Sequence, residues 1–301
     1  MSKKMRGLFD YEYQLELINK HQPPLAKLNN VIDWEMFRTP IEDAFTIEAK
    51  APGGRPPFDR LMMFKILILQ RYYNLSDEQT EFQIKDRLSF MQFLGLQIGD
   101  NVPDQKTIWY FKEQLKEKKL SKKLFELFTQ TLISNGVVAK EGSIVDASFV
   151  NVPRQRNTRE ENETIKQDDI PESFENHPAK LSQKDTDARW MTKNSERHFG
   201  YKNHINADAV TKLITKFTTS SASLHDSQKL EELVNQHDNR LFADSAYRSD
   251  KIESYLWLKK CKSFVHEKAY RSRPLTYAQE RDNTVKSKIR VKVEHVFGYM
   301  T

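Results

Sequence analysis

The sequence predicts an α/β protein in which an all-helical region, residues 1–136, precedes a mixed β-sheet covered by helices, residues 137–301. The first observation is that apolar residues recur at helical spacing between residues 58 and 135, up to a stop signal at Asn135-Gly136. The second is that the period changes at Val137, after which short apolar runs alternate with helical patterns. Strands followed by alternating helices and strands are typical of a mixed sheet with helices on its faces.

The composition excludes several classes of protein. A hydrophobic fraction of 38%, with 18 Phe, 11 Tyr and 4 Trp, is enough to fill a core and excludes global disorder. Cys261 is the single cysteine, which excludes a disulfide framework and a cysteine-based zinc site. The longest apolar run, residues 61–69, is broken by Lys65, and the N-terminus has no apolar signal core. We therefore expect a soluble, cytoplasmic protein without a membrane partner.

Start and stop signals predict the elements of the helical region. Pro23-Pro24 is expected to end a first helix, and Ala51–Pro57 (APGGRPP) is the clearest loop of the chain. Ser76 reads as the N-cap of a helix with an acidic first turn, and Asp104-Gln105-Lys106-Thr107 is expected to start another helix. The expected helices cover residues 11–20, 31–38, 60–73, 77–88, 88–96, 104–115 and 120–132.

The second region is predicted to contain both strands and helices. A polar stretch at about residues 151–200, poor in large apolar residues, is expected to be a long insertion or loop. The expected strands cover residues 137–138, 144–150, 201–209, 213–220, 239–247 and 262–266, and the expected helices cover residues 225–236, 249–260 and 276–298.

Three carboxylates occupy unusual positions in this pattern. Asp146 interrupts an apolar, β-branched run, Asp244 ends a buried strand just before two small residues, and Glu294 lies on a helical pattern near the chain end. The end of a strand is where open α/β sheets place their ligands. Converging carboxylates are the hard oxygen ligands that divalent metal ions use in phosphoryl transfer, with the ions about 3.5–4 Å apart.

Each carboxylate also has an ordinary structural explanation. A salt bridge to a nearby arginine would equally account for a buried Asp146. Arg290 precedes Glu294 by four residues, which is also the spacing of a common helix ion pair. The apolar face of that helix is expected to consist of Val285, Ile289, Val293 and Val296.

Basic residues favour a polyanionic partner. The chain carries a formal net charge of +6, and residues 259–292 contain eleven Lys or Arg against three Asp or Glu. The alternative is a solvated charged surface. His198 and His204 flank a basic stretch, and we expect them at the surface. The candidate phosphate contacts are Arg154, Arg156, Arg159, Lys286, Lys288 and Lys292.

Several motifs together resemble a known family. GSIVDASFVN, HFGYKNHINAD, LHDSQKLEEL, LFADSAYRSD and RVKVEHVFG occur in chain order in the second region, and GRPPFDRLMMFKILILQRYYNLSDEQTEFQIKDRLSFMQFLGL precedes them. They resemble DDE-type bacterial insertion-sequence transposases, specifically the insertion-sequence-five group. The resemblance covers roughly residues 40–300, with motifs in both regions.

The resemblance implies a ribonuclease-H-like catalytic domain after a helical DNA-binding domain. It implies that Asp146, Asp244 and Glu294 are the catalytic and metal-binding acids, that Arg290 steadies a phosphate, and that Mg²⁺ or Mn²⁺ is required, as two ions. The implied partner is double-stranded DNA, both the terminal repeats of the element and the target, bound by a homodimer.

The third acid departs from the extended signature of this family. Ser287 stands where the family has Tyr, and Thr301 where it has a basic residue. Relatives usually carry a further helical segment after the third acid, so we expect either a shortened gene product or a missing extension. A plain metal-dependent nuclease and a catalytically impaired DNA-binding remnant are the two alternative functions.

Overall fold

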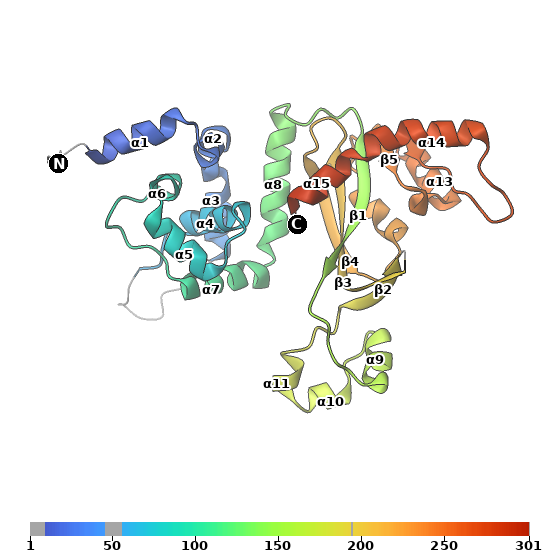
Figure 1. Ribbon diagram of the computed structural model, residues 1–301, viewed down its shortest axis with the longest axis horizontal. Helices are drawn as coiled ribbons and strands as arrows, with labels where there is room; N and C mark the ends of the chain where they lie inside the picture. The colour runs from blue at the N-terminus through green and yellow to red at the C-terminus, as the bar shows by residue number, and fades with distance from the viewer. Residues whose placement is uncertain (1–9, 46–55, 194, 301) are drawn as a thin grey trace, which may run out of the picture. The chain divides into compact units, whose positions relative to one another are not determined.

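The computed structural model describes residues 10–45, 56–193 and 195–300, and Figure 1 shows the order of their elements. The contacts within the chain divide it into two compact units, Met1–Phe128 and Thr129–Thr301. The division falls inside helix α8 (Leu120–Ser134). In the described part of the chain, every helix lacks the length or the apolar character needed to cross a membrane.

The first unit is all-helical, as predicted. Its helices pack around one apolar core in which Ile41, Ile66, Leu69 and Ile84 are fully buried. Its described elements are α1 (Asp10–Lys20), α2 (Pro24–Val31), the 3₁₀ helix η1 (Trp34–Phe37), α3 (Arg38–Ala44), α4 (Arg60–Tyr72), α5 (Asp77–Asp86), α6 (Leu88–Leu94), α7 (Gln105–Glu117) and the start of α8.

The helix starts and ends of this unit follow the sequence signals, with one exception. Ser76 forms a capping box with Gln79, and the Asp104 side chain accepts a hydrogen bond from the Thr107 N–H at 2.7 Å. The first helix ends at Lys20, shortly before Pro23-Pro24, as expected, and Pro24 then begins α2, because proline tolerates the first helical turn. The single helix expected at residues 31–38 is replaced by η1 and α3. Residues 51–55 of the predicted loop lie outside the described residues.

The second unit contains one six-stranded mixed sheet, ordered β2-β3-β1-β5-β6, with β4 also paired to β3. The pairs β1–β3, β2–β3 and β3–β4 are antiparallel, whereas β1–β5 and β5–β6 are parallel. The short strand expected at residues 137–138 is absent. The strands are β1 (Ser143–Asn151), β2 (Arg189–Lys193), β3 (Glu196–Asp208), β4 (Ile214–Ser221), β5 (Arg240–Ala243) and β6 (Lys262–Val265).

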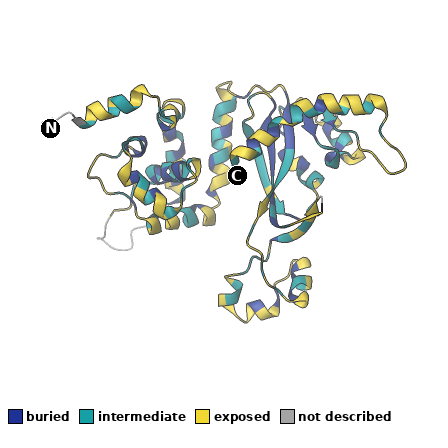
Figure 2. Cartoon of the chain, in the orientation of Figure 1, coloured by how far each residue is buried: buried dark blue, intermediate teal, exposed yellow. Residues whose placement is uncertain are grey.

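Helices cover both faces of this sheet. On one face, Leu230 and Leu233 of α12 (Leu230–Leu233) and Ile252 and Leu256 of α13 (Asp250–Leu258) pack with Val145. On the other face, apolar side chains of α15 (Lys292–Met300) pack against β1, β3 and β5. Between these layers β5, the start of β1 and the second half of β3 are mostly buried, and Figure 2 shows buried segments in the sheet. The helix predicted at residues 225–236 is shorter, formed by the 3₁₀ helix η2 (Asp226–Lys229) and α12.

The polar stretch at residues 151–200 is not a structureless loop, contrary to our expectation. It contains the short helices α9 (Arg159–Lys166), α10 (Glu172–Glu175) and α11 (Pro178–Leu181), and from Arg189 it joins the sheet as β2 and the start of β3. The buried Glu161 carboxylate organises these helices, because it accepts hydrogen bonds from Ser173 and Lys180. Polar residues therefore fold here through a carboxylate-centred network, which a search for apolar periodicity does not detect.

The helix predicted at residues 276–298 is two helices, α14 (Tyr277–Arg290) and α15, separated at Val291. Val293 and Val296 are buried against the sheet, as expected. Val285 was expected on the same apolar face but is 57% exposed, since the break changes which side of the helix faces the sheet.

Candidate active site

Asp146 and Asp244 occupy matching positions on neighbouring parallel strands. β1 and β5 pair Ser143 with Leu241 and Ile144 with Phe242. The same register continued by two residues places Asp146 opposite Asp244, immediately after the end of β5. Because alternate residues of a strand share a face, both carboxylates lie on the face of Ile144 and Phe242, which α15 covers.

The Asp146 carboxylate is mostly buried and has two hydrogen-bond partners. Its Oδ2 accepts from Arg290 Nη1 at 2.7 Å, and its Oδ1 accepts from the Ala147 N–H at 2.9 Å. Burial raises the pKa of Asp146 to about 6, and the charge of Asp244 acts in the same direction, against the lowering effects of the Ala147 N–H and Arg290. A salt bridge to an arginine was the structural explanation that the sequence left open for a buried Asp146. The ion pair with Arg290 is present, but it lowers the pKa of Asp146 by less than burial raises it.

The Asp244 side chain is fixed by the turn that follows β5. Its Oδ1 accepts a hydrogen bond from the Ala246 N–H at 2.9 Å and thereby caps the 3₁₀ helix η3 (Ser245–Tyr247). The fully buried Tyr247 anchors this turn in the core. No ion pair to Asp244 is formed among the described residues. The two neighbouring aspartates therefore share a local excess of negative charge, which favours a cation.

Arg290 supplies the positive charge of this site from the last turn of α14. Its Nη1 binds Asp146, whereas its Nε is buried and has no hydrogen-bond partner within the described part of the chain. A buried donor without an acceptor is unfavourable by about 1–3 kcal/mol. The Arg290 side chain remains 24% exposed, and a partly exposed guanidinium beside the carboxylates is suited to a phosphate oxygen.

Glu294 is not brought to the two aspartates. Its neighbour Val293 is fully buried against the sheet, and Glu294 is exposed on α15. In residues 10–45, 56–193 and 195–300, no three His, Cys, Asp or Glu side chains are grouped so as to hold a metal ion. The structure thus brings together Asp146, Asp244 and Arg290 of the predicted site and leaves Glu294 apart.

His266 is a residue at this site that the sequence analysis did not single out. β5 and β6 pair Ala243 with Val265, so the next position places His266 beside Asp244. The His266 ring lies 3.4 Å, Nε2 to Oγ, from Ser287 of α14. Burial lowers the pKa of His266, and Arg290 and Lys286 lower it further. The available signal was its position directly after a short apolar strand, as for Asp244.

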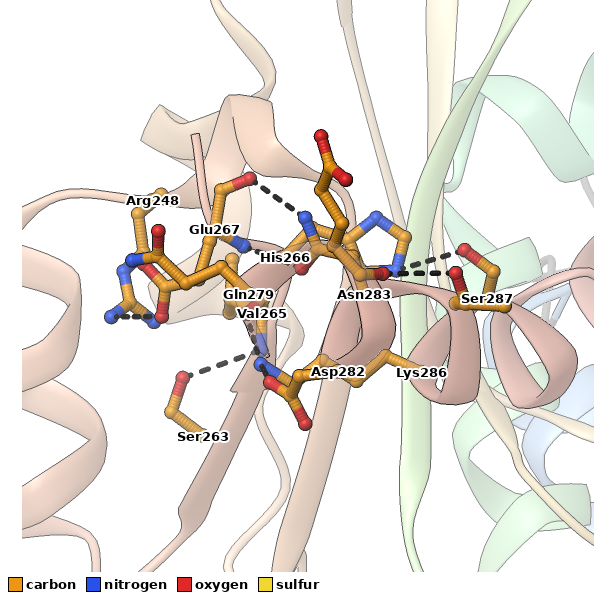
Figure 3. Close-up of polar contacts among 12 residues, drawn as sticks. Arg248, Ser263, Val265, His266, Glu267, Gln279, Asp282, Asn283, Lys286 and Ser287 are labelled. Atoms are coloured by element: carbon orange, nitrogen blue, oxygen red, sulfur yellow. Dashed lines mark hydrogen bonds and ion pairs between the residues drawn. The ribbon is translucent and has the colours of Figure 1, made fainter. Parts of the chain in front are cut away.

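A polar network fixes α14 against the end of β6 (Figure 3). The Asn283 amide binds the backbone of Glu267 twice, accepting from its N–H at 2.8 Å and donating to its carbonyl at 3.1 Å. Lys286 is only 7% exposed; its Nζ donates to the Val265 carbonyl at 3.1 Å and pairs with Asp282 at 2.6 Å. Lys286 was predicted to contact DNA phosphate, but its ammonium is engaged inside the protein.

Comparison with known families agrees with this geometry. A family model described as Transposase DDE domain matches residues 139–301, which contain the whole site. A second model, described as Transposase domain (DUF772), matches residues 12–114 of the helical unit. The chain belongs to the DDE-type insertion-sequence transposases. The search of solved structures found no match.

The mixed sheet between two helical layers is accordingly the ribonuclease-H-like fold of the transposase DDE domain. Divalent metal ions are the general cofactor of this transposase family. Two carboxylates at the same register, one of them with a raised pKa, fit one such ion, because magnesium takes one or two carboxylates and keeps water or phosphate as its other ligands. The arrangement of the described residues does not include a third acid for a second ion.

The other candidate DNA contacts of this transposase differ in their surroundings. Arg154, Arg156 and Arg159 are exposed, but residues 152–188 contain nine Asp or Glu against six Lys or Arg. Lys288 is exposed on α14, whereas Lys292 Nζ donates to the Ala209 carbonyl at 2.8 Å. Lys288 is therefore the best placed of the six for a phosphate contact.

His204 is fully buried on β3, contrary to our expectation of a surface position. Its Nε2 lies 2.8 Å from Ser220 Oγ on the paired strand β4. Burial lowers the pKa of His204 to about 4. His198 is half-buried, with its ring stacked on Phe149 at a centroid distance of 4.2 Å. His204 therefore belongs to the interior of the sheet, whereas His198 stays partly accessible.

Proposed function

We propose that this transposase cleaves DNA at the ends of an element and joins the freed 3′ hydroxyl to target DNA in a metal-dependent reaction. The observation that carries the proposal is the register of the parallel strands β1 and β5, which when continued places Asp146 opposite Asp244, with the Arg290 guanidinium 2.7 Å from Asp146. The membership of the DDE transposases supports the same chemistry.

Asp146 and Asp244 are proposed to hold the first Mg²⁺ or Mn²⁺ ion. When bound, such an ion supplies Lewis-acid stabilisation of the phosphate and lowers the pKa of an attacking water. The aspartates stay ionised in this role, since a nearby cation lowers the pKa of a carboxylate. Their fixed strand register keeps the two ligands in place without a change in the backbone.

Arg290 is proposed to orient the scissile phosphate. The Arg290 side chain is 24% exposed, so an accessible N–H of the guanidinium can donate to a phosphate oxygen while Nη1 stays on Asp146. His266 and Ser287 border the same site, so an adjacent phosphate or its bound water lies within their reach. Glu294 is proposed as the third acid, which requires α15 to turn about the break at Val291.

The proposed partners are the duplex ends of the element and the target duplex, bound by a homodimer. Exposed basic residues of the loop between β6 and α14, Lys268, Arg271 and Arg273, follow directly after His266 and support DNA binding near the site. They add to Lys288 on α14 and do not depend on the buried Lys286.

The proposal is tested with two labelled duplexes, one carrying the native element ends and one serving as target, in the presence of Mg²⁺ or Mn²⁺. Strand-joined products are expected, and their loss is expected in D146N and D244N. Cleavage without joining would instead support a plain nuclease. Binding without cleavage would support the DNA-binding remnant, which the separation of Glu294 from the aspartates favours as the second candidate.

A further inference from the structure

The turn between α7 and α8 concentrates lysines at the surface of the helical unit. Five of the eight residues from 116 to 123 are lysines, and all five are exposed. α7 ends at Glu117 and α8 begins at Leu120, so the lysines lie on both sides of a very short turn. Figure 2 shows this junction as exposed. We call this surface the lysine ridge, formed by Lys116, Lys118, Lys119, Lys122 and Lys123.

The charges of the lysine ridge are not balanced within the unit. Lys116 lies 3.7 Å from Glu113, and no ion pair connects the other four ridge lysines to a carboxylate among the described residues. By contrast, Lys112 one turn earlier pairs with Asp77 at 2.7 Å. The ridge therefore keeps its positive charge available for a partner.

Two ridge lysines also oppose the stability of their own helix. Lys122 and Lys123 lie in the first turn of α8, which contains no acidic residue. The N-terminal end of a helix carries a partial positive charge, so a cation there is unfavourable. Neighbouring ridge lysines repel each other as well. Stability of the helical unit does not explain this arrangement, whereas an external polyanion does.

The shape of α7 favours DNA over a lipid surface as that polyanion. The apolar side chains Ile108, Phe111 and Leu115 are buried in the core, so α7 has no free apolar face to insert into a bilayer. Its outer face instead presents Trp109 and Tyr110, which are 53% and 58% exposed. Exposed aromatic side chains beside lysines are typical of nucleic-acid surfaces.

We propose that the lysine ridge binds the phosphate backbone of duplex DNA. This inference rests on the proposed function and adds the location of a DNA contact surface in the helical unit. Lysine ammonium groups on phosphates do not read base edges, so the ridge strengthens binding to every sequence equally. It lies in a different unit from Asp146 and Asp244, so its contribution to binding is separable from cleavage.

The test compares two triple variants of the full chain that remove the same charge. K119Q/K122Q/K123Q neutralises three ridge lysines without breaking an ion pair, and K20Q/K27Q/K106Q removes three exposed lysines without an ion pair from α1, α2 and the start of α7. Fluorescence anisotropy with an element-end duplex and an unrelated duplex, over about 50 to 200 mM KCl, gives the salt dependence of binding. Circular dichroism confirms that both variants keep their helices.

For the ridge variant, the slope of log K against log[KCl] is expected to fall by about 2.7, because each lost phosphate contact removes about 0.9. The loss is expected to be equal for both duplexes, and the control variant is expected to change the slope by less than about 1. Equal slopes for the ridge and control variants, with wild-type binding intact, would overturn the ridge assignment alone. Failure of the wild-type chain to bind either duplex would overturn the proposed function as well.

Discussion

The strands and the helices of the second unit hold their acids in different ways. Asp146 and Asp244 are positioned by the pairing of β1 with β5, in which backbone hydrogen bonds set the register. Glu294 depends on α15, which follows a break at Val291 and docks through the side chains Val293 and Val296. Backbone pairing fixes the two aspartates relative to each other, whereas side-chain packing allows a helix to turn or shift. The pair of aspartates is therefore formed and the third acid is not.

The two parts of the C-terminal region differ in the same way, because α14 is held by a polar network and α15, after the break at Val291, mainly by apolar packing. α14 is fixed at β6 by Asn283 and the buried Lys286, and this brings Arg290 to Asp146. Beyond Val291 no comparable polar network ties Glu294 to the sheet among the described residues, although Lys292 binds the Ala209 carbonyl. If strand register, and not helix packing, sets the positions of the two aspartates, changes in the strands should have larger effects than changes in the helices.

The largest effect is expected from Gly200→Ala, a substitution in β3 where this strand pairs with β1. Gly200 lies on β3 opposite Asn151 with φ near +144°, and a Cβ there would approach the Val150 carbonyl oxygen to 2.2 Å. Neither the backbone conformation nor the space accepts a side chain, so the β1–β3 pairing must shift. We expect a loss of about 2–4 kcal/mol in the free energy of unfolding, measured by urea denaturation. A loss under about 0.5 kcal/mol would show that the β1–β3 pairing can accommodate a side chain at this position.

A smaller loss is expected when the anchor of α14 is removed. Asn283→Ala deletes two hydrogen bonds to the backbone of Glu267 and leaves that backbone without partners. We expect the free energy of unfolding to fall by about 1–3 kcal/mol. Asn283→Asp retains the acceptor for the Glu267 N–H and serves as the matched comparison. If N283A were as stable as wild type, α14 would be held by other contacts.

A fall in pH is expected to destabilise the folded protein through the protonation of His204. The folded protein lowers the pKa of His204 to about 4 by burial, whereas the unfolded chain binds a proton near pH 6.5. The contribution of His204 to stability is therefore complete above about pH 6.5 and is lost as the pH falls toward 4. Asp226, Lys202, Lys229 and Glu232 surround the ring, and their effects partly cancel.

His204→Gln removes this titration and is expected to flatten the pH dependence of stability. Between about pH 6.5 and 5, the wild-type chain should lose about 1–2 kcal/mol more than the variant. Urea denaturation at these two pH values measures the difference. An identical pH dependence in both proteins would contradict a neutral, buried His204.

The smallest effect is expected in the helix that carries Glu294. Gly298 of α15 has open space at the position of a Cβ, and its backbone is helical. Gly298→Ala should therefore raise the free energy of unfolding by about 0.5–1 kcal/mol, since alanine is the better helix former. Changes of opposite sign in the free energy of unfolding for G200A and G298A would distinguish the tightly constrained β1–β3 pairing from the more tolerant helix α15. Destabilisation by G298A would mean that α15 packs more tightly than its exposure indicates.

The sequence predicted those parts of the site that local pattern determines. An aspartate within or directly after an apolar strand is visible in the chain, and both Asp146 and Asp244 are where that pattern placed them. Partners from distant segments are not visible in this way. A lysine such as Lys286 is expected at the surface from its charge alone. Only the packing of α14 on β6 shows that its ammonium group donates a hydrogen bond to the Val265 carbonyl.

Other features lack any local signal. The break at Val291 occurs without Pro or Gly, so periodicity alone predicts one continuous helix. The position of His266 beside Asp244 requires the register of β5 with β6. The helices within residues 151–200 are organised by Glu161, a charged residue that hydropathy assigns to solvent. In each case the missing information is a long-range contact.

Binding of Mn²⁺ to the DNA-free protein tests the central claim most directly. Isothermal titration with wild type, D146N, D244N and E294Q measures the first ion independently of cleavage. We expect D146N and D244N to lose this binding by more than about tenfold, because each removes one of two carboxylate ligands. E294Q should keep it within about threefold, since Glu294 lies apart from the pair. Loss of binding in E294Q equal to that in D146N, or wild-type binding in either aspartate variant, would contradict a site built on strand register.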